Sequence, residues 1–291
     1  MQAFAEGAVQ ARGLARTLGL PLGIVQVHRF PDGERLPTIP EPTDTVVVYR
    51  SLDRPNEKLV ELILATEAWR RLGAQRLVLV APYLAYLRQD QAFGPGQAIS
   101  QRAIGKLLST SFDRVVTVAA HLHRTHDITS ALPGIEAEDL SPATPLSTYI
   151  GWRANDPVIV GPDAEASPLA SAVAAKLRAP WFNLSKVRSG DRKVEVSLPA
   201  GATVEGRCAV LVDDICSSGA TLERAVELLK QGGAAEICVV VVHALFNQAA
   251  ERRLRQAGAF WIVSTDSVAH PTNAIALADT LAAALRTEIK G

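Results

Sequence analysis

Residues 210–221 read VLVDDICSSGAT, in which two aspartates and a run of small and hydroxyl-bearing residues stand between a strand pattern and a helical pattern. An apolar strand pattern runs directly into two aspartates, which accept hydrogen bonds from sugar hydroxyls or act through Mg²⁺. The small residues after them let backbone N–H groups approach a phosphate, and the helical pattern that follows places a positive dipole end there. The predicted binding residues are Asp213, Asp214, Ser217, Ser218, Gly219, Ala220 and Thr221.

An ordinary strand–turn–helix with a serine as helix N-cap also produces a loop of small residues. The paired aspartates directly before the loop favour the binding site over this simpler interpretation. With them, the segment resembles the phosphoribosyl-diphosphate binding motif of type I phosphoribosyltransferases and of ribose-phosphate diphosphokinases. The motif alone does not separate these two families.

Segments of the N-terminal half separate the two families. They read RFPDGE (29–34), PYLAYLRQD (82–90) and FGPGQAIS (93–100), and His121 follows an expected strand. In the same order, they resemble ribose-phosphate diphosphokinase, and the resemblance covers nearly the whole chain. A simple phosphoribosyltransferase has no need of this first domain.

The resemblance assigns ATP contacts to two of these segments. Residues matching Phe30, Asp32 and Glu34 lie on a loop that reaches the ATP base of a neighbouring subunit, which implies a homo-oligomer, a dimer or larger. An aromatic ring stacks on a base, and carboxylates accept from its amino group. Arg88 and Gln89 match further ATP contacts, and a guanidinium forks onto phosphate oxygens. Taken alone, RFPDGE is also typical of a turn and RQD of a solvated loop.

Lys186 and Arg188, in SKVRSG, match the basic pair on the catalytic loop of the family. The polar stretch 185–193 contains Gly190 and further basic residues, which favours a loop that closes over a triphosphate. Its cations would cancel charge that develops on the transferred group. The alternative is a plain surface hairpin between Phe182 and Val196.

The resemblance implies Mg²⁺ as the cofactor, held by a histidine after the third strand and an aspartate after the first strand of the second domain. Those positions match His121 and Asp163. His123 and His126 lie nearby, but their spacing is loose for a zinc site and no cysteine partner is close. Solvated polar roles are therefore favoured for both.

Four positions depart from the family pattern. Ala119 stands where the family usually has an aspartate, two residues before the metal histidine. Glu165 follows the metal aspartate where small residues are usual, so it either crowds a close backbone approach or adds a metal ligand. Gln91 replaces a frequent basic residue, and Ser217 replaces a frequent aspartate, as in short archaeal-like members.

The sequence also predicts the strands and helices that must bring these segments together. Short β-branched runs alternate with helical stretches in both halves, which predicts an α/β fold. With the resemblance, we expect two tandem phosphoribosyltransferase-like domains, each a largely parallel sheet flanked by helices. Proline and small polar residues at 140–145 mark the join, giving domains 1–141 and 142–291. A last helix over 272–289 caps either domain.

The expected boundaries come from the same patterns. The expected strands are 45–49, 76–81, 114–118, 157–160, 208–212, 237–242 and 261–264. The expected helices besides the last are an N-terminal amphipathic helix within 1–19 and the stretches 56–72, 97–108, 168–177, 221–231 and 248–257.

Composition limits the function classes. Thirty basic and thirty acidic side chains cancel, and no aromatic-basic stripe is present, so we expect no nucleic-acid partner. No apolar run reaches the length of a membrane span, and we expect no membrane partner. The three cysteines show no CxxC spacing, which is compatible with a reducing cytoplasm, the expected location.

Together these features predict a ribose-phosphate diphosphokinase. It would transfer diphosphate from Mg-ATP to C1 of ribose 5-phosphate, giving phosphoribosyl diphosphate and AMP. Two alternatives stay open: a paralogue with another sugar phosphate or nucleotide, and a non-catalytic regulatory homologue. The persistence of His121, Asp163, Lys186, Arg188 and the paired aspartates favours an enzyme.

Overall fold

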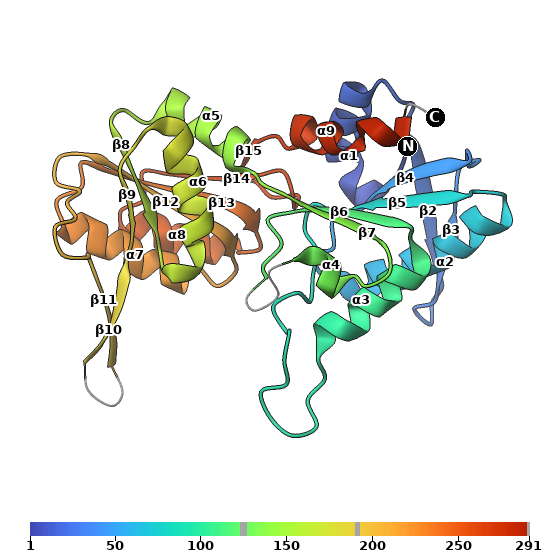
Figure 1. Ribbon diagram of the computed structural model, residues 1–291, viewed down its shortest axis with the longest axis horizontal. Coiled ribbons are helices and arrows are strands. Elements are labelled where there is room, and N and C mark those ends of the chain that lie inside the picture. The colour runs from blue at the N-terminus through green and yellow to red at the C-terminus, as the bar shows by residue number, and fades with distance from the viewer. Residues whose placement is uncertain (123–126, 190–192, 290–291) are drawn as a thin grey trace. The chain divides into compact units, whose positions relative to one another are not determined.

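The computed structural model describes residues 1–122, 127–189 and 193–289, and its chain divides into two compact units. Unit 1 comprises Met1–Leu140, Ser267–Ala269 and Leu277–Gly291, and unit 2 comprises Ser141–Asp266 and His270–Ala276. Figure 1 shows the elements of both. Among the described helices, none has the length and apolarity needed to cross a membrane.

Unit 1 is built on a seven-stranded sheet in the order β3-β2-β1-β4-β5-β6-β7. Every neighbouring pair is parallel except β2 and β3, which form an antiparallel hairpin at the edge. The central strands are runs of β-branched and leucine residues, as expected for a sheet covered on both faces. The strands are β1 (Gln2–Phe4), β2 (Gly23–Arg29), β3 (Arg35–Thr38), β4 (Thr45–Tyr49), β5 (Arg76–Val80), β6 (Arg114–Val118) and β7 (Glu136–Leu140).

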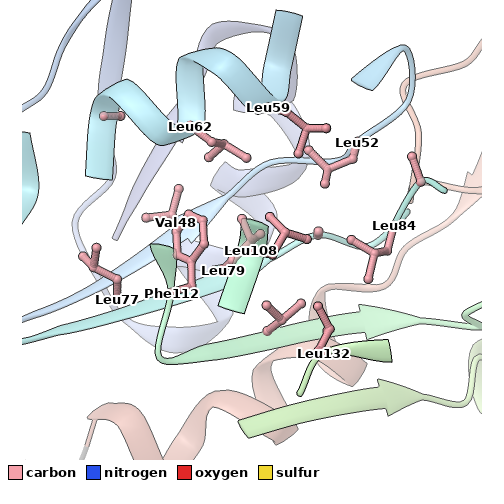
Figure 2. Close-up of a cluster of buried hydrophobic side chains, with 14 of the residues drawn as sticks. Val48, Leu52, Leu59, Leu62, Leu77, Leu79, Leu84, Leu108, Phe112 and Leu132 are labelled. Carbon is pink, nitrogen blue, oxygen red and sulfur yellow. The ribbon is translucent and has the colours of Figure 1, made fainter. Parts of the chain in front are cut away.

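The main core of unit 1 lies between this sheet and helices α2 and α3. In Figure 2, Leu59 and Leu62 of α2 and Leu108 of α3 point toward strand side chains such as Leu77 and Leu79. The C-terminal helix α9 packs beside α1 in the same unit. The helices are α1 (Ala8–Leu18), α2 (Pro55–Arg71), α3 (Ser100–Ser111), α4 (Ile128–Ala131) and α9 (Ala278–Ile289), with a 3₁₀ turn η1 (Ala5–Gly7).

Unit 2 is built on a six-stranded, all-parallel sheet in the order β15-β14-β13-β12-β8-β9. A separate antiparallel hairpin, β10–β11, follows β9. The two longest strands, β12 and β13, lie side by side at the centre, and most of their residues are buried. The strands are β8 (Pro157–Gly161), β9 (Trp181–Asn183), β10 (Ser185–Ser189), β11 (Lys193–Ser197), β12 (Cys208–Cys216), β13 (Glu236–Ala244), β14 (Trp261–Thr265) and β15 (Asn273–Ile275).

Helices α7 and α8 pack together on the unit 2 sheet, and Leu222, Val226 and Leu254 join its core. The apolar residues of α7 recur at helical spacing, which places them on one face. Asn247 caps α8 by accepting the Ala250 N–H at 3.0 Å. The helices are α5 (Ala143–Arg153), α6 (Ser167–Leu177), α7 (Ala220–Gln231) and α8 (Gln248–Ala257), with a 3₁₀ turn η2 (Ala164–Ala166).

Three expected boundaries in unit 1 were wrong by more than one residue. Gln2–Phe4, within the expected N-terminal helix, is an interior strand, because its neighbours β2 and β4 complete its hydrogen bonds. The last helix begins at Ala278 rather than 272, since Asn273–Ile275 pairs with β14. The helix expected over 97–108 runs over Ser100–Ser111 instead.

Candidate active site

Strand β12 carries the two aspartates near its carboxyl end, at the side of the unit 2 sheet where the parallel strands end. The strand continues past the expected end at Val212 to Cys216, because β13 pairs with it along this whole length. Val210–Val212 is fully buried, whereas Asp213 and Asp214 are partly accessible. Carboxyl ends of parallel strands are the usual place for ligand sites in such sheets. The position of the pair therefore fits a binding role.

Burial raises the pKa of Asp213 well above its usual value, and the neighbouring carboxylates of Asp214 and Asp163 raise it further. The Asp214 N–H donates to Asp213 Oδ1 at 2.9 Å, which opposes the shift without cancelling it. Asp163 takes part because it follows β8, the strand next to β12. Three carboxylates thus share one edge, and their oxygens are the donor type that Mg²⁺ prefers. This donor set fits the implied cofactor.

The loop after β12 leads directly into a helix N-terminus. Ser217 and Ser218 are exposed, and Gly219 has a φ of +80°, a conformation that glycine adopts without strain. Helix α7 begins at Ala220, one residue before the expected start, so the open N–H groups of its first turn lie at the loop. An anion at this place would meet backbone donors and the positive end of the helix dipole.

Cys216, at the base of the loop, is a buried thiol. Burial and the nearby Asp213 raise the pKa of this thiol to about 12. The thiolate is the reactive form of cysteine, so Cys216 stays protonated and inert near neutral pH. The Cys216 side chain packs beneath Gly219, where its Sγ would lie 3.9 Å from a Cβ placed on that glycine.

Asp163 is held by the turn that follows it. Its Oδ1 accepts the Glu165 N–H at 3.1 Å and thereby caps the 3₁₀ turn η2, which continues into α6. The Glu165 side chain is exposed. His121 follows β6 in unit 1, whereas Asp163 belongs to unit 2, so their joint role as metal ligands stays a prediction. His123 and His126 lie outside the described residues.

Lys186 and Arg188 lie on β10, whose partner strand is β11. The hairpin follows β9, and β9 runs parallel to β8, so it departs from the edge of the sheet that carries Asp163. The surface hairpin considered from the sequence does form. The side chains of Lys186 and Arg188 lie outside the described part of the structure, and their catalytic role stays a prediction.

The RFPDGE segment forms the tip of the β2–β3 hairpin. Phe30 is exposed and contacts the His28 ring edge-on, with ring centroids 4.5 Å apart. Asp32 accepts the Glu34 N–H at 3.1 Å, and both side chains are exposed. The tip therefore presents an aromatic face and two carboxylates to whatever approaches it.

Arg88 and Gln89 are exposed in the segment after β5. The Gln89 carbonyl accepts the Gln101 N–H at 3.2 Å, which ties this segment to α3. His121 follows the next strand, β6, after Ala119, whose φ is +45°. The predicted ATP contacts and the predicted metal histidine thus lie in segments that follow the carboxyl ends of β2, β5 and β6 of one sheet.

Arg253, on α8, is a residue that the sequence patterns did not identify. Its Nη2 donates to the Ser218 carbonyl oxygen at 2.7 Å, although the two residues lie 35 positions apart. A surface arginine on an amphipathic helix gives no sequence signal for such a contact. Only the packing of α8 against α7 creates it.

Two domain families match the chain. The N-terminal domain of ribose phosphate pyrophosphokinase matches residues 6–111, and the phosphoribosyl transferase domain matches residues 146–277. The chain is 36% identical over 287 residues to the ribose-phosphate pyrophosphokinase of Methanopyrus kandleri, covering 97% of each chain. It is 35% identical over 243 residues to that of Thermococcus kodakarensis, covering 83% of this chain and 85% of that one.

A solved structure shows the same fold. The phosphoribosylpyrophosphate synthetase from Mycobacterium smegmatis aligns with a TM-score of 0.84 and 24% identity, covering 100% of this chain and 98% of that one. The predicted α/β fold with two domains of this type is confirmed by that alignment and by the two matching domain families.

Proposed function

The chain belongs to the ribose-phosphate pyrophosphokinase family, whose members are ATP-dependent diphosphotransferases, and on that premise we propose how its own residues act. The reaction moves the diphosphate group of ATP to C1 of ribose 5-phosphate, leaving AMP. The observation that carries the proposal is the edge of the unit 2 sheet, where a phosphate loop follows directly on a cluster of aspartates.

The sugar phosphate binds at this edge. Its 5-phosphate lies on Ser217–Thr221, where hydroxyl and backbone N–H groups donate to the phosphate oxygens. Asp213 and Asp214 accept hydrogen bonds from the ring hydroxyls. This arrangement orients C1 away from the loop, so its hydroxyl is available for attack.

ATP binds with Arg88 and Gln89, while Phe30, Asp32 and Glu34 hold the base of an ATP in a neighbouring subunit. The hairpin follows β2, which is three strand positions from β5, and this spacing corresponds to about 14 Å along the sheet edge. A homo-oligomer, a dimer or larger, would bring the hairpin tip of one protomer to the nucleotide of the next.

In the transfer step, the C1 hydroxyl oxygen attacks the β-phosphorus of ATP in line and loses its proton. The bond between the β-phosphorus and the oxygen that bridges it to the α-phosphorus breaks, and that oxygen leaves with AMP. Lys186 and Arg188 stabilise the negative charge on the reacting phosphates. His121 and Asp163 would hold Mg²⁺, which supplies charge neutralisation on the phosphate oxygens when bound. The protein contributes positioning and electrostatics rather than a covalent intermediate.

The same proposal extends to the organisation of the chain. The predicted domains 1–141 and 142–291 would correspond to the two units, with the C-terminal helix completing the first. The expected cytoplasmic location suits an enzyme whose substrates are ATP and a sugar phosphate.

The test is to incubate the purified protein with ribose 5-phosphate, Mg²⁺ and ATP and to measure AMP. We expect AMP release that requires the sugar phosphate. Release that requires a different sugar phosphate or nucleotide would indicate a paralogue. Retained nucleotide binding with no turnover on any of these would instead indicate a regulatory homologue.

A further inference from the structure

Helix α8 donates a hydrogen bond to the phosphate loop, Ser217–Thr221, through the side chain of Arg253. Its Nη2 donates to the Ser218 carbonyl oxygen at 2.7 Å, and its Nε donates to Glu223 Oε2 at 3.0 Å. Glu223 lies in the first turn of α7, directly after the loop. The planar guanidinium therefore bridges the loop and the helix that follows it, a geometry that a single arginine provides better than other cations.

The Ser218 carbonyl belongs to the peptide unit whose N–H is that of Gly219. In a trans peptide the C=O and the N–H point in opposite directions. A carbonyl held toward Arg253 on α8 therefore directs the Gly219 N–H away from α8. A phosphate on that side of the loop would meet this N–H as a donor.

This peptide needs an external restraint because of its glycine. Gly219 has a φ of +80°, and glycine populates positive and negative φ about equally, so its own backbone preference does not fix the orientation. Rotation of the Ser218–Gly219 peptide would replace the N–H donor with a carbonyl oxygen, which repels phosphate. The hydrogen bond from Arg253 opposes that rotation.

Helix α8 is positioned to hold Arg253 in place. A Cβ placed on Gly219 would lie 3.4 Å from Ala250 Cβ and 3.9 Å from Leu254 Cδ1, so the loop packs directly on this helix. Both Ala250 and Leu254 are buried. The neighbouring Arg252 is exposed as Arg253 is, but its Nη1 donates to Gln248 Oε1, at 3.3 Å, within α8 itself.

We propose that Arg253 is a positioning residue for the sugar phosphate, which fixes the Ser218–Gly219 peptide with its N–H toward the bound phosphate. The inference rests on the proposed function for the identity of the ligand. Arg253 acts through the backbone of the loop and is not itself the phosphate ligand, because Glu223 already balances its charge.

The test compares Arg253→Ala, Arg253→Lys and Arg252→Ala in the full-length protein. For Arg253→Ala we expect KM for ribose 5-phosphate to rise at least tenfold, with KM for ATP and kcat changed less than threefold. Arg253→Lys should restore part of the loss, because an ammonium also donates to the carbonyl. Arg252→Ala should behave as the unchanged protein does. Equal increases in both KM values, or an equal effect of Arg252→Ala, would overturn the inference.

Binding of ribose 5-phosphate, measured by calorimetry without ATP, separates this inference from the proposed function. A protein that binds the sugar phosphate but does not turn over, and whose affinity falls at least tenfold in Arg253→Ala, would contradict the function and support the positioning role. Unchanged affinity in a folded Arg253→Ala would overturn the positioning role whether or not turnover occurs.

Glu223→Gln distinguishes positioning from direct charge attraction. If Arg253 fixes the peptide, loss of the Glu223 charge should leave ribose 5-phosphate binding unchanged or weaken it. If Arg253 instead attracted the phosphate directly, release from Glu223 would tighten binding, and that result would overturn the proposal.

Discussion

Asp213 illustrates, at the scale of single residues, how a binding site opposes stability. Its raised pKa means that the folded protein favours the protonated form, so ionisation of this carboxyl group destabilises the fold. Burial is the first cause, and the negative charges of Asp214 and Asp163 add to it. Residues arranged for a polar ligand or cation commonly carry such a conflict.

Asp213→Asn should therefore raise stability while lowering activity. We expect Tm without substrates to increase by about 2–4 °C, the shift that about 1 kcal/mol produces in a chain of roughly this size. Turnover should fall by about 100-fold, because an amide is a weaker acceptor for the sugar hydroxyls. Differential scanning fluorimetry and the AMP assay measure the two effects.

Asp156→Asn is the matched control for this change. Asp156 pairs with Arg207 on the surface of unit 2, and that contact lowers the pKa of its carboxyl group. Its substitution should leave Tm unchanged or lower it, and activity should stay the same. A lower Tm for Asp213→Asn than for the unchanged protein would contradict the interpretation of Asp213.

Lys186→Ala tests the predicted catalytic cation. We expect kcat to fall by about 100-fold, since the charge on the transferred phosphate would lose a partner. The exposed Lys176, on α6, supplies the control, and Lys176→Ala should leave kcat unchanged. A loss smaller than about tenfold, equivalent to about 1.4 kcal/mol on the barrier, would remove Lys186 from the mechanism.

At the scale of elements, close packing of helices decides which substitutions the chain tolerates. Gly105 lies on the face of α3 that meets α4, and a Cβ there would come within 1.9 Å of the Ala131 carbonyl oxygen. The glycine is required for this contact and not for backbone conformation. Helix α1, in the same unit, carries Gly13, and a Cβ there would lie 3.9 Å from its nearest neighbour, Ala278 Cβ.

Gly105→Ala should destabilise the protein, and Gly13→Ala should not. Overpacking against α4 costs about 1–3 kcal/mol, partly offset by the better helix propensity of alanine. Gly13→Ala gains that propensity, up to about 1 kcal/mol, without the clash. Urea unfolding of both variants measures the difference, and equal midpoints would show that α3 and α4 move apart without cost.

At the scale of the whole molecule, the C-terminal helix is joined to strands far away in the sequence. Glu288 of α9 pairs with Arg76 of β5 at 2.7 Å and with Arg114 of β6 at 2.8 Å. The Glu288 side chain is 6% exposed. The hydrogen bond from Arg76 is the first cause of its lowered pKa, and the bond from Arg114 contributes to it.

Glu288→Gln should weaken folding in a pH-dependent way. A lowered pKa stabilises the fold above the unfolded value of 4.5, and this contribution is lost as pH falls through the folded pKa. We expect a loss of about 1–2 kcal/mol at pH 7, because solvent reaches Arg76 and screens the pair. The loss should shrink toward zero in acid.

Urea unfolding at several pH values measures this difference. Glu67→Gln, in the exposed pair of Glu67 with Arg71 on α2, should change stability by less than about 0.5 kcal/mol at every pH. A constant difference between Glu288→Gln and the unchanged protein across pH would show that packing, rather than charge, holds α9.

The sequence alone determined the family, the α/β fold and the long central strands of both units. Strands β4 and β6 and helix α8 have the expected boundaries, because a continuous run of buried residues or a strong helical period is a local signal. The phosphate loop was identifiable for the same reason, since a strand, two aspartates, small residues and a helix are contiguous.

Only the tertiary structure decided the contacts between distant segments. The short strand β1 exists because β2 and β4 lie on either side of it, and no three-residue pattern predicts that. Parallel pairing of β12 and β13 brings the sulfur atoms of Cys208 and Cys238 to 3.7 Å, although they lack any motif spacing. Arg253 contacts Ser218 for a related reason, because the packing of α8 against α7 brings together two residues that are 35 positions apart in the sequence. The types of the functional side chains can be read from the sequence. Their orientation depends on contacts with distant segments, and those contacts form only in the folded chain.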